Sequence, residues 1–177
     1  MEGTKGTGLG KGIAILRVAL GSGFLFAGLD KALDLTGSGK AFNAAGFLKG
    51  ATGGAWLGSD PKAIVNPTHD FWVGLAGNAS LVSVINTMVV FGEIAIGVAL
   101  ILGLASRFAS YAAVLMMAMF YVANWSFANG PFNEQFMYGI TALVLAVVGA
   151  GEYYGLDAIV DRSEVVKRTP ILRYVLA

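Results

Sequence analysis

Two residue types that often carry redox or metal chemistry are almost missing from this 177-residue sequence. It has no cysteine and a single histidine. The sequence therefore cannot form disulfides, iron–sulfur clusters or sulfur-ligated zinc sites, and it cannot supply two histidines to a haem. We expect no haem, iron–sulfur cluster, zinc or other metal site. A redox function would depend on a carrier that the protein binds.

Charged residues are also scarce, at 13% of the chain, and 12 lysines and arginines nearly balance 11 aspartates and glutamates. A net charge of +1 provides no basic face for nucleic acid, so nucleic-acid binding is excluded. Hydrophobic residues reach 56%, whereas a soluble domain has roughly 45–50% apolar and about 25% charged residues. The composition predicts an integral membrane protein in contact with the lipid bilayer.

Four apolar runs are long enough to cross a bilayer, which takes roughly 20 helical residues. They cover residues 13–33, 81–104, 108–125 and 133–151. We expect one all-α domain over residues 1–177, an integral membrane four-helix bundle with a tail at 158–177. The first run follows basic residues, as in a signal peptide, but we expect it to be retained as an anchor helix.

The connection between the first two runs, residues 36–77, is long for a structureless loop. Asn66 followed by Pro67 is typical of a helix N-cap and first turn. The apolar face of that helix would hold Phe71, Trp72 and Leu75. We therefore expect short interfacial helices in this loop, with its two tryptophans, Trp56 and Trp72, at the depth of the lipid headgroups.

The distribution of lysine and arginine predicts the orientation, because cytoplasmic segments carry the excess of these residues. Four spans place both termini on one side. That side carries Lys5, Lys11, Arg17, Arg107, Arg162, Lys167, Arg168 and Arg173, and the other carries Lys31, Lys40, Lys49 and Lys62. We expect a multi-pass protein of the cell membrane with cytoplasmic N- and C-termini and an extracytoplasmic loop.

Small residues recur every four positions in each apolar run, which is the spacing that lets membrane helices approach closely. The four stripes are Ala19, Gly23 and Ala27; Ala95, Ala99 and Gly103; Ala105, Ala109 and Ala113; and Ala142, Ala146 and Ala150. We expect these stripes to form the contact faces of the bundle.

Glu93 and Arg17 are the strongest candidates for a catalytic role. An ionisable side chain inside a span costs roughly 2.5–3.5 kcal/mol on insertion scales, so it needs a partner or a function. Glu93 lies near the middle of the second run, too deep for a carboxylate to reach water. It could pair with Arg17, remain protonated, or simply clamp two helices together. Arg17 could also extend to the headgroups instead of facing inward.

A second polar set lies in the outer half of the predicted bundle. Helical spacing places these side chains on faces that could line a pocket for a cofactor. The set is Tyr121, Asn124, Trp125, Glu134, Tyr138, Asp30 and Lys31. The alternative is an aromatic belt with a few interfacial charges.

Five segments carry a recognisable pattern: residues 17–31 (RVALGSGFLFAGLDK), 92–97 (GEIAIG), 102–107 (LGLASR), 149–157 (GAGEYYGLD) and, in the long loop, 42–48 (FNAAGFL). With the first four segments in this order along the chain, the sequence resembles the DoxX/DoxD family of small four-helix membrane proteins over most of its length. The resemblance places Arg17, Lys31, Glu93 and Asp157 at the family's recurring charged positions.

The resemblance implies a quinone-linked redox role, because the family takes its name from the small membrane subunit of a thiosulfate:quinone oxidoreductase. In that role the cofactor is a quinone and another membrane subunit is the partner. Glu93, Tyr121, Asn124, Glu134 and Tyr138 would then be hydrogen-bond partners of the quinone carbonyls. Arg17 would tune Glu93, and Lys31 could attract an anion such as thiosulfate.

Two other functions fit the same sequence. Small-residue stripes and a short chain would suit a non-catalytic accessory subunit of a larger respiratory or other redox membrane complex, or a homo-oligomer. A small-solute transporter would need an inverted repeat or broken helices, and neither is evident in the sequence.

Overall fold

The computed structural model describes residues 8–52, 66–125 and 131–160, and within these ranges every regular element is a helix. Four helices are long: α1 (Gly8–Leu33), α4 (Ala79–Leu102), α5 (Ser106–Ala123) and α6 (Glu134–Val147). The short ones are α2 (Ala44–Thr52), α3 (His69–Ala76), the 3-10 helix η3 (Ala150–Glu152) and α7 (Asp157–Val160). The expected all-helical class is confirmed.

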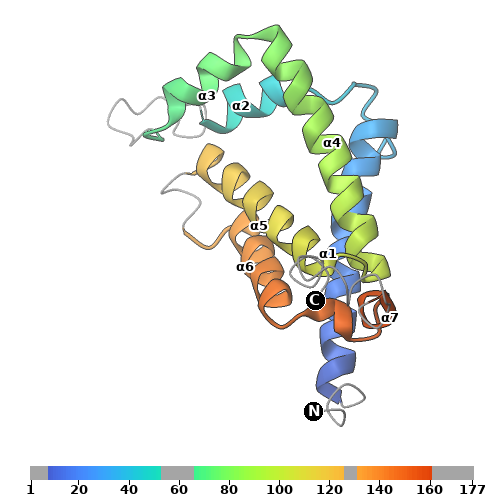
Figure 1. Cartoon of the computed structure of the whole chain (residues 1–177). Coiled ribbons are helices and arrows are strands. Elements are labelled where there is room, and N and C mark those ends of the chain that lie inside the picture. The colour runs from blue at the N-terminus through green and yellow to red at the C-terminus, as the bar shows by residue number, and fades with distance from the viewer. Residues whose placement is uncertain (1–7, 53–65, 126–130, 161–177) are drawn as a thin grey trace.

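Glycines bring α1 and α4 together as an antiparallel pair (Figure 1). A Cβ added to Gly21 would lie 2.9 Å from the Cβ of Leu100, and one added to Gly28 would lie 3.0 Å from the Cβ of Glu93. A Cβ on Gly97 would lie 2.5 Å from the backbone nitrogen of Leu25. Any larger residue at these three positions would push the two helices apart.

The stripes expected on the first two runs are contact faces only in part. Ala19, Gly23 and Ala95 are exposed, whereas Gly103 is buried, as are Gly21, Gly28 and Gly97. Gly21 and Gly28 lie seven residues apart on another side of α1, so a stripe at spacing four does not identify which side packs.

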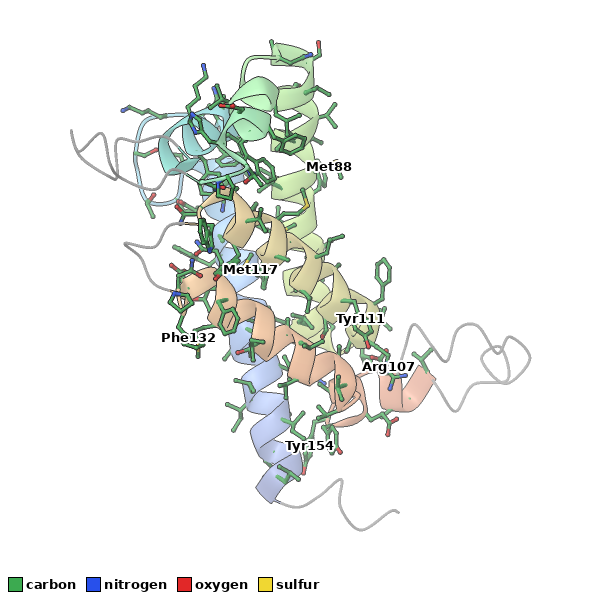
Figure 2. The ribbon with its side chains drawn as sticks, turned by 90° about the vertical axis from the view of Figure 1, so that its left-hand side faces the viewer. Met88, Arg107, Tyr111, Met117, Phe132 and Tyr154 are labelled. Atoms are coloured by element: carbon green, nitrogen blue, oxygen red, sulfur yellow. The ribbon has the colours of Figure 1, made fainter. Side chains whose placement is uncertain are left out.

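α5 and α6 form the second pair, and here the expected stripes are confirmed. Ala109 and Ala113 on α5 are buried, as are Ala142 and Ala146 on α6 and Ala150 just beyond it. Large apolar side chains point away from the packed faces, including Met88, Tyr111 and Phe132 (Figure 2). These exposed side chains are suited to contact with lipid.

Three helices, α1, α4 and α5, are long and apolar enough to cross a membrane. The fourth run is shorter than predicted, because α6 ends at Val147 rather than continuing to residue 151. At about 1.5 Å per residue its 14 residues span about 21 Å, less than the roughly 30 Å of a bilayer core. Gly149 adopts the left-handed conformation, with φ of 62°, and turns the chain into η3.

The long connection does contain short helices, and α2 and α3 pack against the far ends of α4 and α5 (Figure 1). Their cluster contains Leu48, Trp72, Ala76 and Ala123. The N-cap of α3 is Thr68, not Asn66. Asn66 instead donates to the carbonyl oxygens of Val122 (2.8 Å) and Ala123 (3.1 Å) at the end of α5.

Two details of the expected interfacial helix differ in the structure. Phe71 is exposed, whereas Trp72 is buried against α2 and α5 rather than free on a surface. Trp56 lies outside the described residues, as do most residues of the predicted tail.

Candidate functional site

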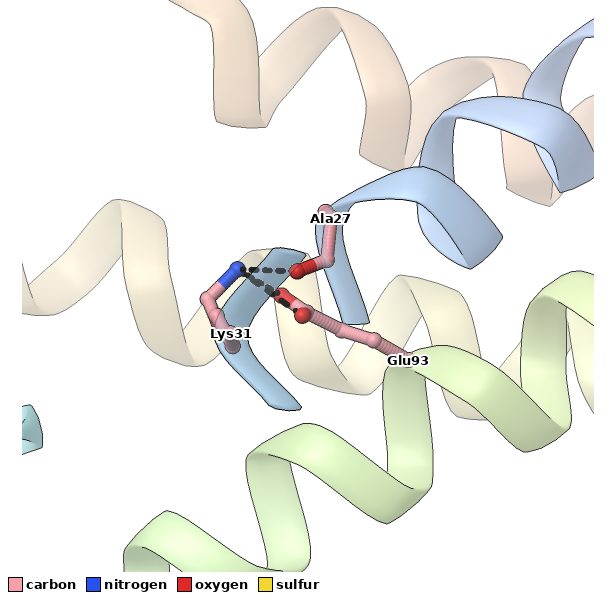
Figure 3. A network of polar contacts seen from close by, with 3 residues as sticks. All are labelled: Ala27, Lys31 and Glu93. Atoms are coloured by element: carbon pink, nitrogen blue, oxygen red, sulfur yellow. Dashed lines mark hydrogen bonds and ion pairs between the residues drawn. The ribbon is translucent and has the colours of Figure 1, made fainter. Parts of the chain in front are cut away.

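Lys31 and Glu93 form an ion pair between α1 and α4 (Figure 3). The Nζ atom of Lys31 lies 2.8 Å from Oε2 of Glu93 and donates a 3.0 Å hydrogen bond to Oε1. It also donates to the carbonyl oxygen of Ala27 at 3.3 Å. Glu93 is 3% exposed, so its carboxylate interacts with the lysine instead of with water.

The packing of the two helices explains this position. Gly28 lets the backbone of α1 approach Glu93, and Lys31 lies one turn further along the same face. Gly92 lies beside Met116 of α5, ten residues after Ser106. Ten residues correspond to about 15 Å along α5. The ion pair therefore lies about half-way along a span, where an unpaired charge would be costly.

The ion pair opens into a cavity of about 200 Å³, the pair cavity, between α1 and the α5–α6 pair. Lys31 and Glu93 line one side, and Glu134, Gln135 and Tyr138 of α6 line the other. Most of the remaining wall is apolar, formed by Ala19, Leu20, Gly23, Phe24, Ala27, Met117 and Phe120. The cavity thus places hydrogen-bond donors and acceptors around a space with apolar walls.

Four residues predicted from the sequence meet in this cavity: Lys31, Glu93, Glu134 and Tyr138. Lys31 was expected near the outer interface, but it lies at the depth of Glu93 because α1 ends two residues later while α4 continues beyond it. Gln135 was not predicted. The sequence did contain a signal for Gln135, because it is a polar residue next to Glu134 in the first turn of α6.

The other predicted ligands lie elsewhere. The hydroxyl of Tyr121 donates to the carbonyl oxygen of Pro131 at 3.2 Å, and Asp30 accepts from the backbone N–H of Thr36 at 2.8 Å. Asn124 is the C-cap of α5, and Trp125 follows it. None of these four residues is among the described residues that line the pair cavity.

Arg17 does not pair with Glu93. Its guanidinium donates to the carbonyl oxygens of Ala150 (2.7 Å), Tyr153 (3.0 Å) and Tyr154 (3.4 Å). Arg17 precedes Lys31 by 14 residues, about 21 Å along α1, and packs beside Gly103 rather than beside Glu93. Of the alternatives left open for Glu93, pairing with Arg17 is therefore not the one observed, because Arg17 lies about four turns of α1 away from the lysine that meets Glu93.

Asp157 lies in the same cluster as Arg17. We call these two residues, with Gly103, Ala150 and Gly155, the Arg17 cluster. The carboxylate accepts from the backbone N–H groups of Ala105 (2.7 Å) and Ser106 (2.9 Å), so it caps α5 from a distant part of the chain. Burial raises the pKa of Asp157, while these hydrogen bonds and the charge of Arg17 oppose that rise.

A second, larger cavity of about 760 Å³, the α4–α5 groove, lies between α4 and α5 beneath α2 and α3. Its lining is apolar apart from Lys31, which is the only charged side chain among the described lining residues. Lys31 and Phe120 line both cavities. The two cavities are therefore adjacent, and Lys31 and Phe120 form the junction between them.

The comparison with protein families bears directly on this arrangement. A family model described as TQO small subunit DoxD, where TQO is thiosulfate:quinone oxidoreductase, matches residues 13–175. No curated protein sequence and no solved structure matches the chain. Because the match covers nearly the whole sequence, the chain belongs to the DoxD family.

Proposed function

We propose that this chain is the small membrane subunit of a thiosulfate:quinone oxidoreductase-like complex and that its pair cavity binds a quinone headgroup. The observation that carries the proposal is the position of the Lys31–Glu93 pair, in which the carboxylate is buried and which lines a cavity that Tyr138 also lines. A pair that served only to join two helices would not need a cavity beside it.

The residues of the pair cavity fit a quinone. The apolar walls, which include Phe24 and Phe120, suit a ring. The cavity volume of about 200 Å³ is below the roughly 300–1,000 Å³ of sites for drug-sized ligands, so the cavity suits a headgroup alone. Quinone carbonyls accept hydrogen bonds, which Lys31 and the Tyr138 hydroxyl can donate. The hydroxyls of a quinol donate them, and the carboxylates of Glu93 and Glu134 can accept.

A bound quinone supplies the redox chemistry by taking up two electrons and two protons to become a quinol. The electrons come from two thiosulfate ions that join through a new S–S bond. The chain has no cysteine that could react with thiosulfate, so we assign this oxidation to the partner subunit. Lys31 and Tyr138 would orient the ring, and the carboxylate oxygens of Glu93 and Glu134 would hold the protons that the ring oxygens take up.

The same proposal includes an orientation. Arg17 and the segment after α6 lie at one end of the helices, and α2 and α3 lie at the other (Figure 1). In the sequence, the excess of lysine and arginine lies before and within the first half of α1, at the start of α5, and after α7. By the positive-inside rule we assign the Arg17 end to the cytoplasm and α2 and α3 to the outer side.

Substitution of Glu93 tests the proposal in membranes that contain the complete complex. We expect Glu93→Gln to lower thiosulfate-dependent quinol formation at least about tenfold, since a positioned proton-transfer group contributes roughly 10²–10⁴-fold. The matched control is Asp30→Asn, because an amide oxygen can still accept from Thr36 and Asp30 lies outside the cavity. This variant should retain normal turnover.

A quinone carrying a diazirine on its ring gives a second measurement that needs no turnover. We expect it to label residues of α1 and α4 around Lys31 and Glu93, with competition by unmodified quinone. Unchanged turnover in Glu93→Gln, together with ring labelling elsewhere, would contradict the proposal. That result would support the alternative, a non-catalytic accessory subunit of a redox membrane complex.

A further inference from the structure

The α4–α5 groove has no part in the chemistry described so far. We infer that it holds the isoprenoid tail of the quinone whose ring occupies the pair cavity. This inference rests on the proposed function and adds a binding site for the tail. It follows from the chemistry of the groove, its junction with the pair cavity, its volume and the position of its open side.

The lining of the groove selects an apolar occupant. α4 contributes Ile85, Val89 and Ile96, and α5 contributes Ala112 and Met116. The residues from α2 and α3 are also apolar, among them Leu48 and Trp72. A space lined in this way offers water too few hydrogen-bond partners, so hydrocarbon fills it.

The junction with the pair cavity selects a hydrocarbon chain with a polar end. Lys31 and Phe120 line both spaces. The Lys31 ammonium also lies 5.6 Å from the centre of the Phe42 ring, which belongs to the groove. A ring held in the pair cavity could therefore pass its tail between Lys31 and Phe120 into the groove. A quinone has this division into polar ring and apolar tail.

The groove is too small to enclose a helix of another subunit or of a second copy. A membrane-spanning helix occupies a cylinder about 10–12 Å wide and about 30 Å long, roughly 2,500 Å³. The groove offers about 760 Å³. This is enough for a narrow hydrocarbon chain, whereas a helix could only rest across the opening.

The position of the open side allows a tail to enter from the bilayer. Exposed residues at the edges of the groove include Met88 on α4 and Phe108, Leu115 and Met119 on α5. The end of the groove is covered by α2 and α3, which are held by the hydrogen bond from the Ala44 N–H to Asn86 (2.8 Å) and by Asn66. A tail would thus enter sideways, between α4 and α5.

Photolabelling of the whole protein in lipid nanodiscs tests the inference by location rather than by activity. The probe is a quinone with a diazirine near the end of its tail. We expect it to label peptides of α4 and α5 that line the groove, with competition by an excess of unmodified quinone. Ala95→Phe and Ala112→Phe, which place a ring in the groove, should reduce this labelling at least fivefold.

The control variant is Ala118→Phe, since Ala118 is exposed on α5 and is not among the described groove residues. It should leave labelling unchanged. If Ala95→Phe or Ala112→Phe prevents folding, Ala112→Leu is used in its place, because leucine adds less volume. Each variant is checked by its thermal unfolding before labelling.

The outcomes separate the groove from the proposed function. Tail labelling spread over the outside of the helices, equal to that from a diazirine phospholipid, would reject the tail site. Competed ring labelling at Lys31 in the same sample would then leave the proposed function intact. Loss of competition for both the ring probe and the tail probe would reject both. Equal labelling in Ala112→Phe and Ala118→Phe would also reject the groove.

Discussion

Among the described residues, a basic side chain lies near a buried carboxylate in two places, and the two places differ in what surrounds the charges. Arg17 is 2% exposed and is held by carbonyl oxygens of residues 150–154, and Asp157 is 0% exposed and is held by two N–H groups at the start of α5. Lys31 and Glu93 are held mainly by each other, beside a cavity. Backbone groups cannot be exchanged for a ligand, but a side chain next to a cavity can change partners.

This difference assigns different roles to residues that looked equivalent in the sequence. The Arg17 cluster ties α1 to the turn after α6, and the Asp157 carboxylate ties the same turn to α5. We interpret the cluster as a structural lock. The Lys31–Glu93 pair closes one side of a space, so we interpret it as part of a binding site. Each substitution below tests this assignment.

Removal of Arg17 should have the largest effect. Arg17→Met leaves three carbonyl oxygens and the Asp157 carboxylate without their cation, and breaking a buried charged network in this way costs about 3–5 kcal/mol. We expect most of the protein to be lost during purification, with a strongly lowered midpoint of thermal unfolding in the remainder. Lys11→Met, at an exposed position on the same helix, should unfold like the wild type.

The ion pair should respond differently because its partners depend on each other. Lys31→Met or Glu93→Gln alone leaves one buried group unpaired and should destabilise the protein by about 3 kcal/mol. The double variant removes both charges and should regain most of that stability. Thermal unfolding of the four proteins measures the coupling.

The double variant also separates stability from function. It should fold but show much weaker ring labelling near position 31 and little quinol formation, since two of the four polar side chains proposed to meet the ring are gone. A double variant that is stable and fully active would remove the distinction between the two charged sites. A double variant as unstable as the single ones would show that neighbouring groups, not the pair itself, require these charges.

The sequence was sufficient to predict the helices and part of the site. Apolar runs and turn residues placed α4 and α5 within two residues of their observed ends. Helical spacing also placed Lys31, Glu134 and Tyr138 in one outer polar set, and depth placed Glu93 near the middle of its span; these four residues line one cavity. These predictions depend only on local period and depth.

Other features depend on how helices face each other, which local period does not determine. Arg17, Gly21, Phe24, Gly28 and Lys31 share the buried side of α1, but the Ala19 side looked equally suitable by spacing. Which side of α1 packs against α4 also determines which residue pairs with Glu93. The end of α6 could not be read from hydropathy either, because Gly149 turns the chain inside an apolar run.

A glycine in the Arg17 cluster gives a smaller test of the lock. Gly103 has φ of 66°, and a Cβ there would lie 2.5 Å from the Cα of Gly155 and 2.7 Å from Nη1 of Arg17. We expect Gly103→Ala to lower the free energy of unfolding by about 1–3 kcal/mol. Gly23→Ala is the control, because a Cβ at Gly23 would meet no atom within 4 Å.

Tyr138 and Tyr121 offer the comparison with the smallest expected effect and the sharpest separation of site from scaffold. Tyr138 lines the pair cavity, whereas the Tyr121 hydroxyl is bonded to Pro131. Tyr138→Phe removes one hydrogen bond, worth about 0.5–1.5 kcal/mol, so competition by quinone should require a concentration roughly three to ten times higher. Tyr121→Phe should leave that concentration unchanged. Equal shifts in both variants would mean that the ring does not lie against α6, and Tyr138 would then belong with the lipid-facing aromatics.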